Sequence, residues 1–211
     1  NKKLSISGSG KFRIDKDFEK IDYFFEKNKN RLKFDANFSL ENTNFVISDI
    51  NYQKSNKSLL NLDIKGEVID GNRLNINKFN LNEENNEINF KNLHFNKSNQ
   101  IIKVEAARFN YIDTESKKNY FYIKNLNSND YVIKGQSFNA NTLISKLLES
   151  KTKKENNFFQ NSLNIKIDLP LVFLDKINFV KKLKGTLNIS NNNVKFAQVS
   201  ASFKNSQKIS F

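Results

Sequence analysis

The strongest constraint on the fold of this chain is a repeated alternation of apolar and polar residues. In the segment RLKFDANFSL, residues 31–40, an apolar side chain occupies every second position. The same pattern recurs in five more segments, at residues 58–70, 73–81, 87–95, 101–111 and 119–126. Because successive side chains of a β-strand point to opposite faces, this period predicts strands with one apolar and one polar face. The connections are short and polar, which favours hairpins between neighbouring strands.

These patterns predict a mainly β fold, built as a long, curved antiparallel meander sheet that resembles a groove. One short amphipathic helix is expected near residues 139–150. Asn139 or Asn141 is its expected N-cap. Its apolar stripe is formed by Leu143, Ile144, Leu147 and Leu148. Residues 18–29 fit either a helical turn or a strand.

The chain is expected to form part of one extended β-groove domain over residues 1–211. Repeating strands would occupy 1–135, the helix and a polar linker 136–157, and further strands of the same sheet 158–211. The chain begins with Asn1 and contains no Met, so we expect an internal or C-terminal-region fragment. No apolar stretch approaches the roughly 20 residues that a membrane-spanning helix needs.

A weak repeat of fourteen residues crosses the middle of the chain. Its apolar positions read I-x-x-F-x-L at 76–81, F-x-x-L-x-F at 90–95 and V-x-x-A-x-F at 104–109. The step of three residues breaks the alternation. Either the strand switches face at this step or a β-bulge absorbs the extra residue. A bulge at the same place in successive strands would curve the sheet as a unit.

Residues that could carry out catalysis are scarce. The chain has no cysteine, which excludes a disulfide framework, a thiolate zinc site and a cysteine nucleophile. His94 is the one histidine and is expected on the polar side of its strand, while Glu83, Asp113 and Glu115 fall in turns. Phosphate-binding glycine motifs are absent from the sequence. We therefore expect a protein that is not an enzyme and has no cofactor and no metal.

The net charge of +13 allows attraction to nucleic acid or to anionic lipid head groups. The lysines are scattered singly between strand residues, however, which is typical of a solvated basic surface. The aromatic residues occupy the regular apolar positions rather than forming a separate platform for base stacking. We therefore expect no nucleic-acid partner.

Three segments, taken in order, resemble the AsmA-like proteins of Gram-negative envelopes, and most closely their YhdP branch. They are YVIKGQSFNANTLISKLL (131–148), NSLNIKIDLPLVFL (161–174) and KLKGTLNISNNNVKFAQVSASF (182–203). The first contains the tetrad Phe138-Asn139-Ala140-Asn141, with asparagine at two positions where the family usually has aspartate and arginine. The resemblance implies that the helix lies beside a long, curved sheet and serves its architecture.

The resemblance also implies a function in the cell envelope. Relatives are anchored in the inner membrane, extend through the periplasm and carry phospholipid toward the outer membrane along an apolar groove. The implied partners are phospholipid and other envelope proteins. The resemblance also implies contact with the inner membrane, through an anchor upstream of this chain. The residues expected to line the groove are Leu62, Ile64, Leu74, Ile76, Phe79, Leu81, Ile88, Phe90, Leu93, Phe95, Val104 and Phe109. The alternative is a closed β scaffold or a protein-interaction module without a lipid ligand.

Overall fold

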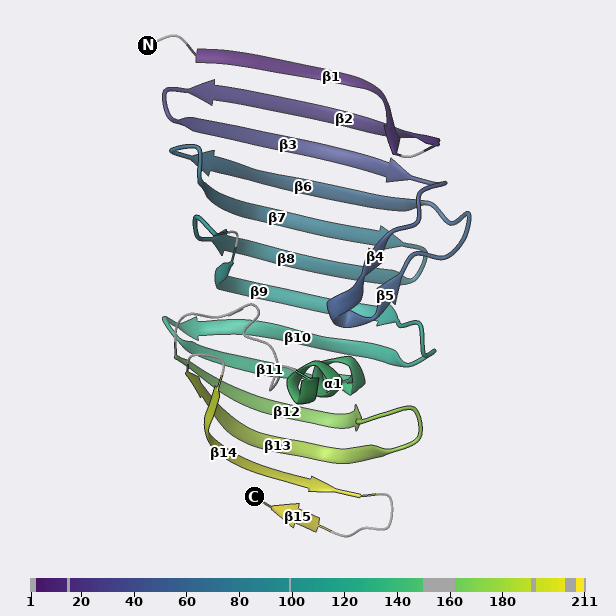
Figure 1. Cartoon of the computed structure of the whole chain (residues 1–211), viewed down its shortest axis with the longest axis vertical. Helices are drawn as coiled ribbons and strands as arrows, with labels where there is room; N and C mark the ends of the chain where they lie inside the picture. Colours follow the sequence, from purple (N-terminus) through teal and green to yellow (C-terminus); the bar gives the residue numbers. More distant parts are fainter. Residues whose placement is uncertain are drawn as a thin grey trace. The chain divides into compact units, whose positions relative to one another are not determined.

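The computed structural model describes residues 3–14, 16–98, 100–149, 162–190, 193–203 and 208–210. It confirms a mainly β fold with one short helix (Figure 1). The strands of the large sheet are β1 (Lys3–Ile14), β2 (Asp17–Asn28), β3 (Arg31–Leu40), β6 (Leu60–Ile69), β7 (Arg73–Glu83), β8 (Asn86–Phe95), β9 (Ile101–Ile112), β10 (Lys118–Asn127), β11 (Asp130–Asn139), β12 (Leu163–Phe173), β13 (Phe179–Ser190), β14 (Asn193–Ser202) and β15 (Lys208–Ser210). The segment 18–29 is therefore a strand rather than a helical turn.

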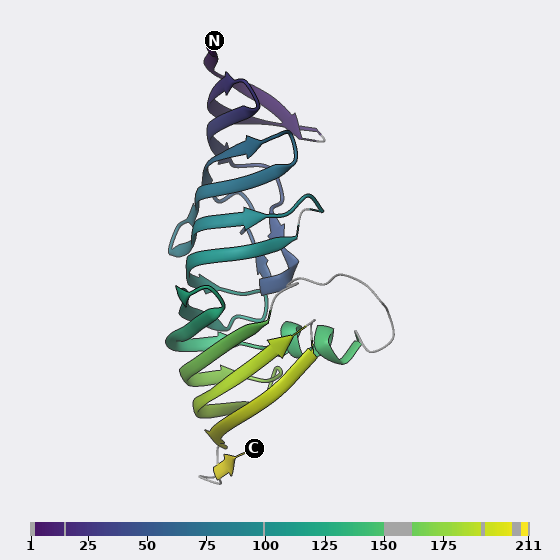
Figure 2. The same cartoon turned by 90° about the vertical axis from the view of Figure 1, so that its left-hand side faces the viewer.

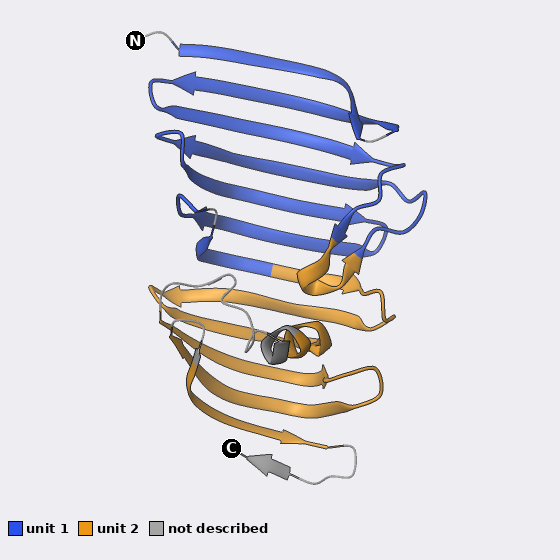
Figure 3. Cartoon of the chain, viewed as in Figure 1, with its two compact units in different colours: residues 1–46, 53–107 blue, residues 47–52, 108–211 orange. Residues whose placement is uncertain are grey.

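The strands are hydrogen-bonded in the order β1-β2-β3-β6-β7-β8-β9-β10-β11-β12-β13-β14-β15, so the sheet is not closed. The chain divides into two compact units (Figure 3). Unit 1 contains residues 1–46 and 53–107, and unit 2 contains residues 47–52 and 108–211. The boundary falls within β9. The expectation of one extended domain stays a prediction.

A short excursion interrupts the meander between β3 and β6. It contains β4 (Val46–Ile47), the 3-10 turn η1 (Ser48–Ile50) and β5 (Tyr52–Gln53). Among the strands that the structure describes, β4 and β5 pair with each other as a separate two-stranded sheet. The connection between β6 and β7, by contrast, is a tight turn. Between β6 and β7, Asp70 and Gly71 both have positive φ, of 53° and 71°. Such angles favour Gly and tolerate Asp, which confirms the turn chemistry of this segment.

In unit 1 the three-residue step of the sequence repeat is absorbed by a β-bulge. The register shifts between Lys65 and Gly66, which face Lys78 and Ile76 of β7, so β7 carries one extra residue. In β8 the corresponding step from Phe90 to Leu93 lies directly opposite the step from Ile76 to Phe79, and the β7–β8 register needs no shift. The bulge keeps the apolar residues on both sides of the step on one face.

Unit 2 departs from a purely antiparallel meander at one place. Strands β11 and β12 are parallel, with Asp130 opposite Asn164 and Asn139 opposite Phe173. Helix α1 (Asn141–Glu149) lies in the connection between them. It lies in front of β11 and β12 in Figure 1 and to one side of the sheet in Figure 2. Because parallel neighbours cannot be joined by a hairpin, the chain needs a crossover here, and α1 belongs to it.

The helix lies where the sequence predicts it, but the prediction of Asn139 or Asn141 as its N-cap is wrong. The carbonyl of Ala140 accepts the first helical hydrogen bond, from the N–H of Ile144 at 2.8 Å, so Ala140 is the N-cap. The Asn139 side-chain oxygen accepts from the N–H of Asn141 at 3.1 Å. The side chains of Leu147 and Leu148, and the linker at residues 150–161, lie outside the described residues.

Candidate functional site

Unit 1 presents one continuous apolar face, which we define by its cross-strand rows. In an antiparallel sheet, residues directly opposite one another share a face. Three adjacent rows run across β1, β2, β3, β6, β7 and β8: Ile6–Phe25–Phe34–Gly66–Ile76–Leu93, Gly8–Tyr23–Ala36–Ile64–Phe79–Phe90 and Gly10–Ile21–Phe38–Leu62–Leu81–Ile88. Every member is apolar, aromatic or glycine, so this face carries no charge over three rows.

The opposite face of unit 1 is polar and carries ion pairs between neighbouring strands. They are Lys3–Glu26 at 2.7 Å, Arg31–Glu67 at 3.4 Å, Lys65–Asp35 at 3.1 Å, Lys78–Asp63 at 3.5 Å and Lys91–Glu105 at 2.6 Å. Exposed pairs of this kind contribute little to stability. Their main consequence is that this face is compatible with water, whereas the apolar face is not.

The structure places eleven of the twelve predicted lining residues in unit 1 and Phe109 in unit 2. Leu62, Leu81, Ile88 and Leu93 share the apolar face but are buried. Six others remain partly exposed on it: Ile64, Leu74, Ile76, Phe79, Phe90 and Phe95. Val104 of β9 is also partly exposed. The accessible part of the face extends to residues that the sequence analysis did not select, such as Ile6 and Phe25, which are 57% and 37% exposed.

Two buried carboxylates hold the ends of the β3–β6 excursion against the apolar face of unit 1. Glu19 is 2% exposed and accepts hydrogen bonds from the backbone N–H groups of Glu41, Asn42 and Thr43, at 2.8, 2.8 and 2.6 Å. Burial by itself would raise the pKa of Glu19, but the three N–H donors outweigh it and lower the pKa below its ordinary value. The excursion is therefore fixed at its first residues.

Glu83 fixes the other end of the excursion. Glu83 is buried and lies opposite Leu60. Its carboxylate accepts hydrogen bonds from the N–H of Ser55 at 2.6 Å, from the Ser58 hydroxyl and from the side-chain amide of Asn86 at 3.2 Å. The buried ammonium of Lys54 donates to the carbonyl of Glu41 at 2.8 Å and ties the two ends together. This arrangement explains why the apolar residues at this end of the strands are buried.

Unit 2 has an aromatic core and a buried polar network. Phe109 stacks on Phe121 with ring centroids 4.5 Å apart, and Phe121 meets Phe138 edge-on at 4.8 Å. Tyr111 packs against Tyr52 at 5.9 Å and donates its hydroxyl hydrogen bond to a backbone carbonyl at 2.7 Å. Burial, together with the nearby negative charge of Asp113, raises the pKa of Tyr111. Phe109 therefore contributes to this aromatic core, and its predicted place in the lining of a groove stays a prediction.

The polar network joins the β9–β10 turn to the start of helix α1. The side-chain amide of Asn139 donates to Asp113 Oδ2 at 2.8 Å and to Glu115 Oε2 at 2.9 Å. Asn141 donates to Glu115 Oε1 at 2.8 Å, and Asn119 donates to Asp113 Oδ2 at 3.0 Å. The N–H of Asn139 donates to Asn119 Oδ1 at 2.8 Å. Asn139 and Asn141 of the tetrad are uncharged, and they donate hydrogen bonds to the carboxylates of Asp113 and Glu115.

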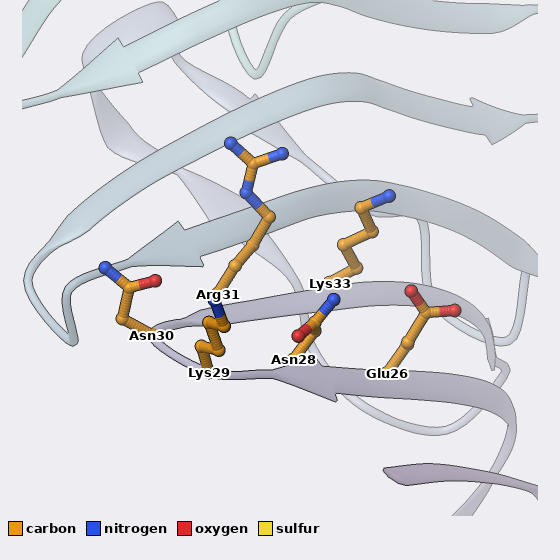
Figure 4. Close-up of a pocket in the computed structure, with 6 residues that line it drawn as sticks. All are labelled: Glu26, Asn28, Lys29, Asn30, Arg31 and Lys33. Carbon is orange, nitrogen blue, oxygen red and sulfur yellow. The ribbon is translucent and has the colours of Figure 1, made fainter. Parts of the chain in front are cut away.

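A polar hollow of about 310 Å³ lies at the hairpin between β2 and β3 (Figure 4). It is lined by Glu26, Asn28, Lys29, Asn30, Arg31 and Lys33. Glu26 and Arg31 are already engaged in ion pairs with other strands, and the hollow is open to solvent. Because Glu26, Arg31 and Lys33 alternate with apolar-face residues, it belongs to the polar side of the sheet.

Other candidate chemistry is limited. His94 lies opposite Asn75 on the polar face, half-exposed, as the sequence predicts. Among the residues that the structure describes, no group of three or more His, Cys, Asp or Glu side chains is placed to hold a metal ion. In the same described segments, no helix is long and apolar enough to cross a membrane.

No protein-family model, no curated protein and no solved structure matches this chain. The resemblance to AsmA-like proteins therefore stays a prediction.

Proposed function

We propose that this chain binds phospholipid acyl chains along the apolar face of unit 1 and takes part in moving lipid between the two membranes of a Gram-negative envelope. In this proposal it is a non-enzymatic, periplasmic segment of an AsmA-like protein that is anchored in the inner membrane. The observation that carries the proposal is the contrast between the two faces of unit 1. One has three charge-free rows with partly exposed Phe and Ile side chains, and the other carries ion pairs.

Physical chemistry favours a lipid as the occupant. Large exposed apolar patches mark ligand or partner surfaces, and each CH₂ of an acyl chain buried on such a face contributes about 0.8 kcal/mol. The chain has a net charge of +13, which attracts anionic head groups that remain in water. If only the acyl chains are buried, no head-group pocket is required. The three charge-free rows of the apolar face fit this binding mode.

The decisive test compares two adjacent phenylalanines. Phe25 lies on the apolar face and Phe24 on the polar face, and they are 37% and 40% exposed. The purified chain is incubated with vesicles of phosphatidylethanolamine and phosphatidylglycerol, separated from them and examined by native mass spectrometry. We expect bound phospholipid with the original chain and with Phe24→Asp, and several-fold less with Phe25→Asp.

Phe90→Asp extends the test to the β8 end of the middle row, where Phe90 packs edge-on against Phe79 at 5.6 Å. It should abolish lipid binding, provided that circular dichroism and thermal unfolding show an intact fold. Equal lipid binding by Phe24→Asp and Phe25→Asp would contradict the proposal. A lipid-free chain whose apolar rows are strongly protected in hydrogen exchange would favour the closed scaffold instead.

A further inference from the structure

A lysine projects from the apolar face of unit 1, next to the three charge-free rows. The row that contains it lies at the ends of the strands near the β2–β3 and β6–β7 turns (Figure 1). Its members lie opposite one another across five strands and are Leu4–Lys27–Leu32–Val68–Leu74. Lys27 is exposed and is the one charged member of this row. It shares a face with Phe25, because side chains two residues apart on a strand point the same way.

Lys27 differs from the ion-paired lysines of the polar face. Four lysines there are paired with carboxylates of neighbouring strands: Lys3, Lys65, Lys78 and Lys91. Among the residues that the structure describes, none forms an ion pair with Lys27. The residues opposite Lys27 are leucines, and its neighbour Glu26 lies on the polar face and binds Lys3. The ammonium of Lys27 is therefore available to an anionic ligand.

The other ends of the apolar rows carry carboxylates. There Phe12 lies opposite Glu19, and Leu60 lies opposite Glu83. Both carboxylates are buried and already accept hydrogen bonds from the β3–β6 excursion. The nearby ammonium of Lys54 is buried and donates to backbone carbonyls. A phosphate at this end would meet two carboxylates, whereas at the end with Lys27 it would meet an exposed ammonium.

The distance between the two ends suits an acyl chain. A strand rises about 3.3 Å per residue, so the row of Lys27 and the charge-free row of Ile21 lie about 20 Å apart. The acyl chains of one leaflet span about 15 Å, which is half the thickness of the hydrocarbon core of a bilayer. Acyl chains that run along the strands can therefore cover the charge-free rows while the phosphate of the same lipid reaches Lys27.

We propose that the apolar face of unit 1 holds a phospholipid in one orientation, with its phosphate at Lys27 and its acyl chains running along the strands toward Glu19 and Glu83. This inference rests on the proposed lipid binding and adds a direction to it. The stem of a lysine covers apolar surface while its ammonium stays in water, so the head group remains hydrated. An exposed ion pair is weak. It therefore selects the orientation of a lipid that is held by burial of its acyl chains.

Photo-crosslinking tests the orientation. The probe is a phosphatidylglycerol that carries a diazirine at the end of one acyl chain, loaded onto the whole chain at low ionic strength and irradiated. Trypsin then separates residues 58–65, which contain Leu62 of the far charge-free row, from residues 66–73, which contain Val68 of the Lys27 row. Mass spectrometry of the peptides should show about twofold or more label on 58–65 relative to 66–73.

Two comparisons show whether the phosphate and Lys27 cause this preference. A diacylglycerol with the same diazirine has no phosphate and should label both peptides alike, a comparison that needs no variant. Lys27→Glu should remove the preference of the phosphatidylglycerol probe. Lys20→Glu is the matched control, because Lys20 lies opposite Lys11 on the polar face of the same strand, and this variant should keep the preference. Circular dichroism checks the fold, and at saturating lipid the amount bound should stay the same in both variants.

The outcomes separate this inference from the proposed function. A preference for residues 58–65 that is lost in Lys27→Glu and kept in Lys20→Glu supports the orientation. Equal labelling of both peptides, or a preference that survives Lys27→Glu or is shared by the diacylglycerol, would overturn it and leave the binding of acyl chains standing. If the original chain took up neither lipid, the proposed function would fail, and the orientation with it.

Discussion

Asn139 connects two parts of unit 2 that are far apart in the sequence. Its amide nitrogen lies 2.8 Å from Asp113 Oδ2 and 2.9 Å from Glu115 Oε2, and the residue is buried. Changing Asn139→Asp would remove this donor and add a third carboxylate to the pair. We expect a loss of about 2–4 kcal/mol in the free energy of unfolding at pH 7, because buried acceptors lose their donor and like charges meet. Urea denaturation measures it.

The pH dependence of the stability of Asn139→Asp provides a control for this prediction. The deficit of Asn139→Asp relative to the original chain should shrink as the pH falls toward about 4, because a protonated carboxyl can again donate a hydrogen bond. Asn139→Ala lacks this group, and its deficit should not recover in this way. If Asn139→Asp were as stable as the original chain at pH 7, the network would not hold the helix in place.

Glu19 gives unit 1 a stability that depends on pH. Its pKa is lowered from the ordinary value of 4.5 because three backbone N–H donors outweigh the effect of burial. Its contribution is therefore fully present above pH 4.5 and is lost as the pH falls through the folded-state pKa. We expect Glu19→Gln to lower the free energy of unfolding by about 1–2 kcal/mol at pH 7 and by much less at pH 3. A deficit of equal size at both pH values would contradict this.

These residue roles were only partly visible in the sequence. Asn139 was predicted at the helix start from local capping chemistry, and its side chain does bind the N–H of Asn141. Glu83, Asp113 and Glu115 were interpreted as turn residues. Their partners Ser55, Asn139 and Asn141 are distant in the sequence, so only the folded register brings them together. A polar residue at the end of an apolar row, such as Glu19, is the one signal that could have indicated a buried carboxylate.

The bulge between β6 and β7 depends on a glycine. A β-carbon at Gly66 would lie 2.3 Å from the carbonyl oxygen of Asn75 and 2.8 Å from the ring of Phe34. Because backbone must move to accommodate it, Gly66→Ala should lower the free energy of unfolding by about 1–3 kcal/mol. Gly10→Ala is the matched control: nothing lies within 4 Å of its added β-carbon, and we expect no loss. Chemical denaturation measures the free energy of unfolding of both variants. Equal losses in Gly66→Ala and Gly10→Ala would contradict the requirement for glycine at the bulge.

The elements were well predicted where the signal was local. Alternation indicated the strands, and the D-G-N segment indicated the turn after β6, because both depend on neighbouring residues alone. The parallel pairing of β11 with β12 was not predicted, although its signal was present. A helix between two strands usually connects parallel neighbours. Because the whole sheet was interpreted as an antiparallel meander, the predicted helix was not read as such a connection.

For the molecule as a whole, the sequence predicted that one face would be apolar but not which residues would remain accessible. The three-residue steps left the face assignment open, and the register of β7 with β8 resolves it. Leu81 and Ile88 are buried although Ile76 and Phe79 on the same face stay partly exposed, and the alternation in the sequence does not distinguish them. Ile6 and Phe25 were missed because their exposure depends on how β1, β2 and β3 pair in the folded sheet.

The net charge of +13 and the apolar face should respond differently to salt. Raising the salt concentration from about 0.1 M to about 1 M shortens the screening length from about 10 Å to about 3 Å. Attraction of lysines to phosphatidylglycerol vesicles then weakens, whereas burial of acyl chains does not. We expect slower transfer of a fluorescent phospholipid from these vesicles but nearly the same amount bound at equilibrium. Phosphatidylcholine vesicles should show little change in rate. A several-fold fall in the equilibrium amount would mean that the chain holds lipid by its surface charge rather than by its apolar face.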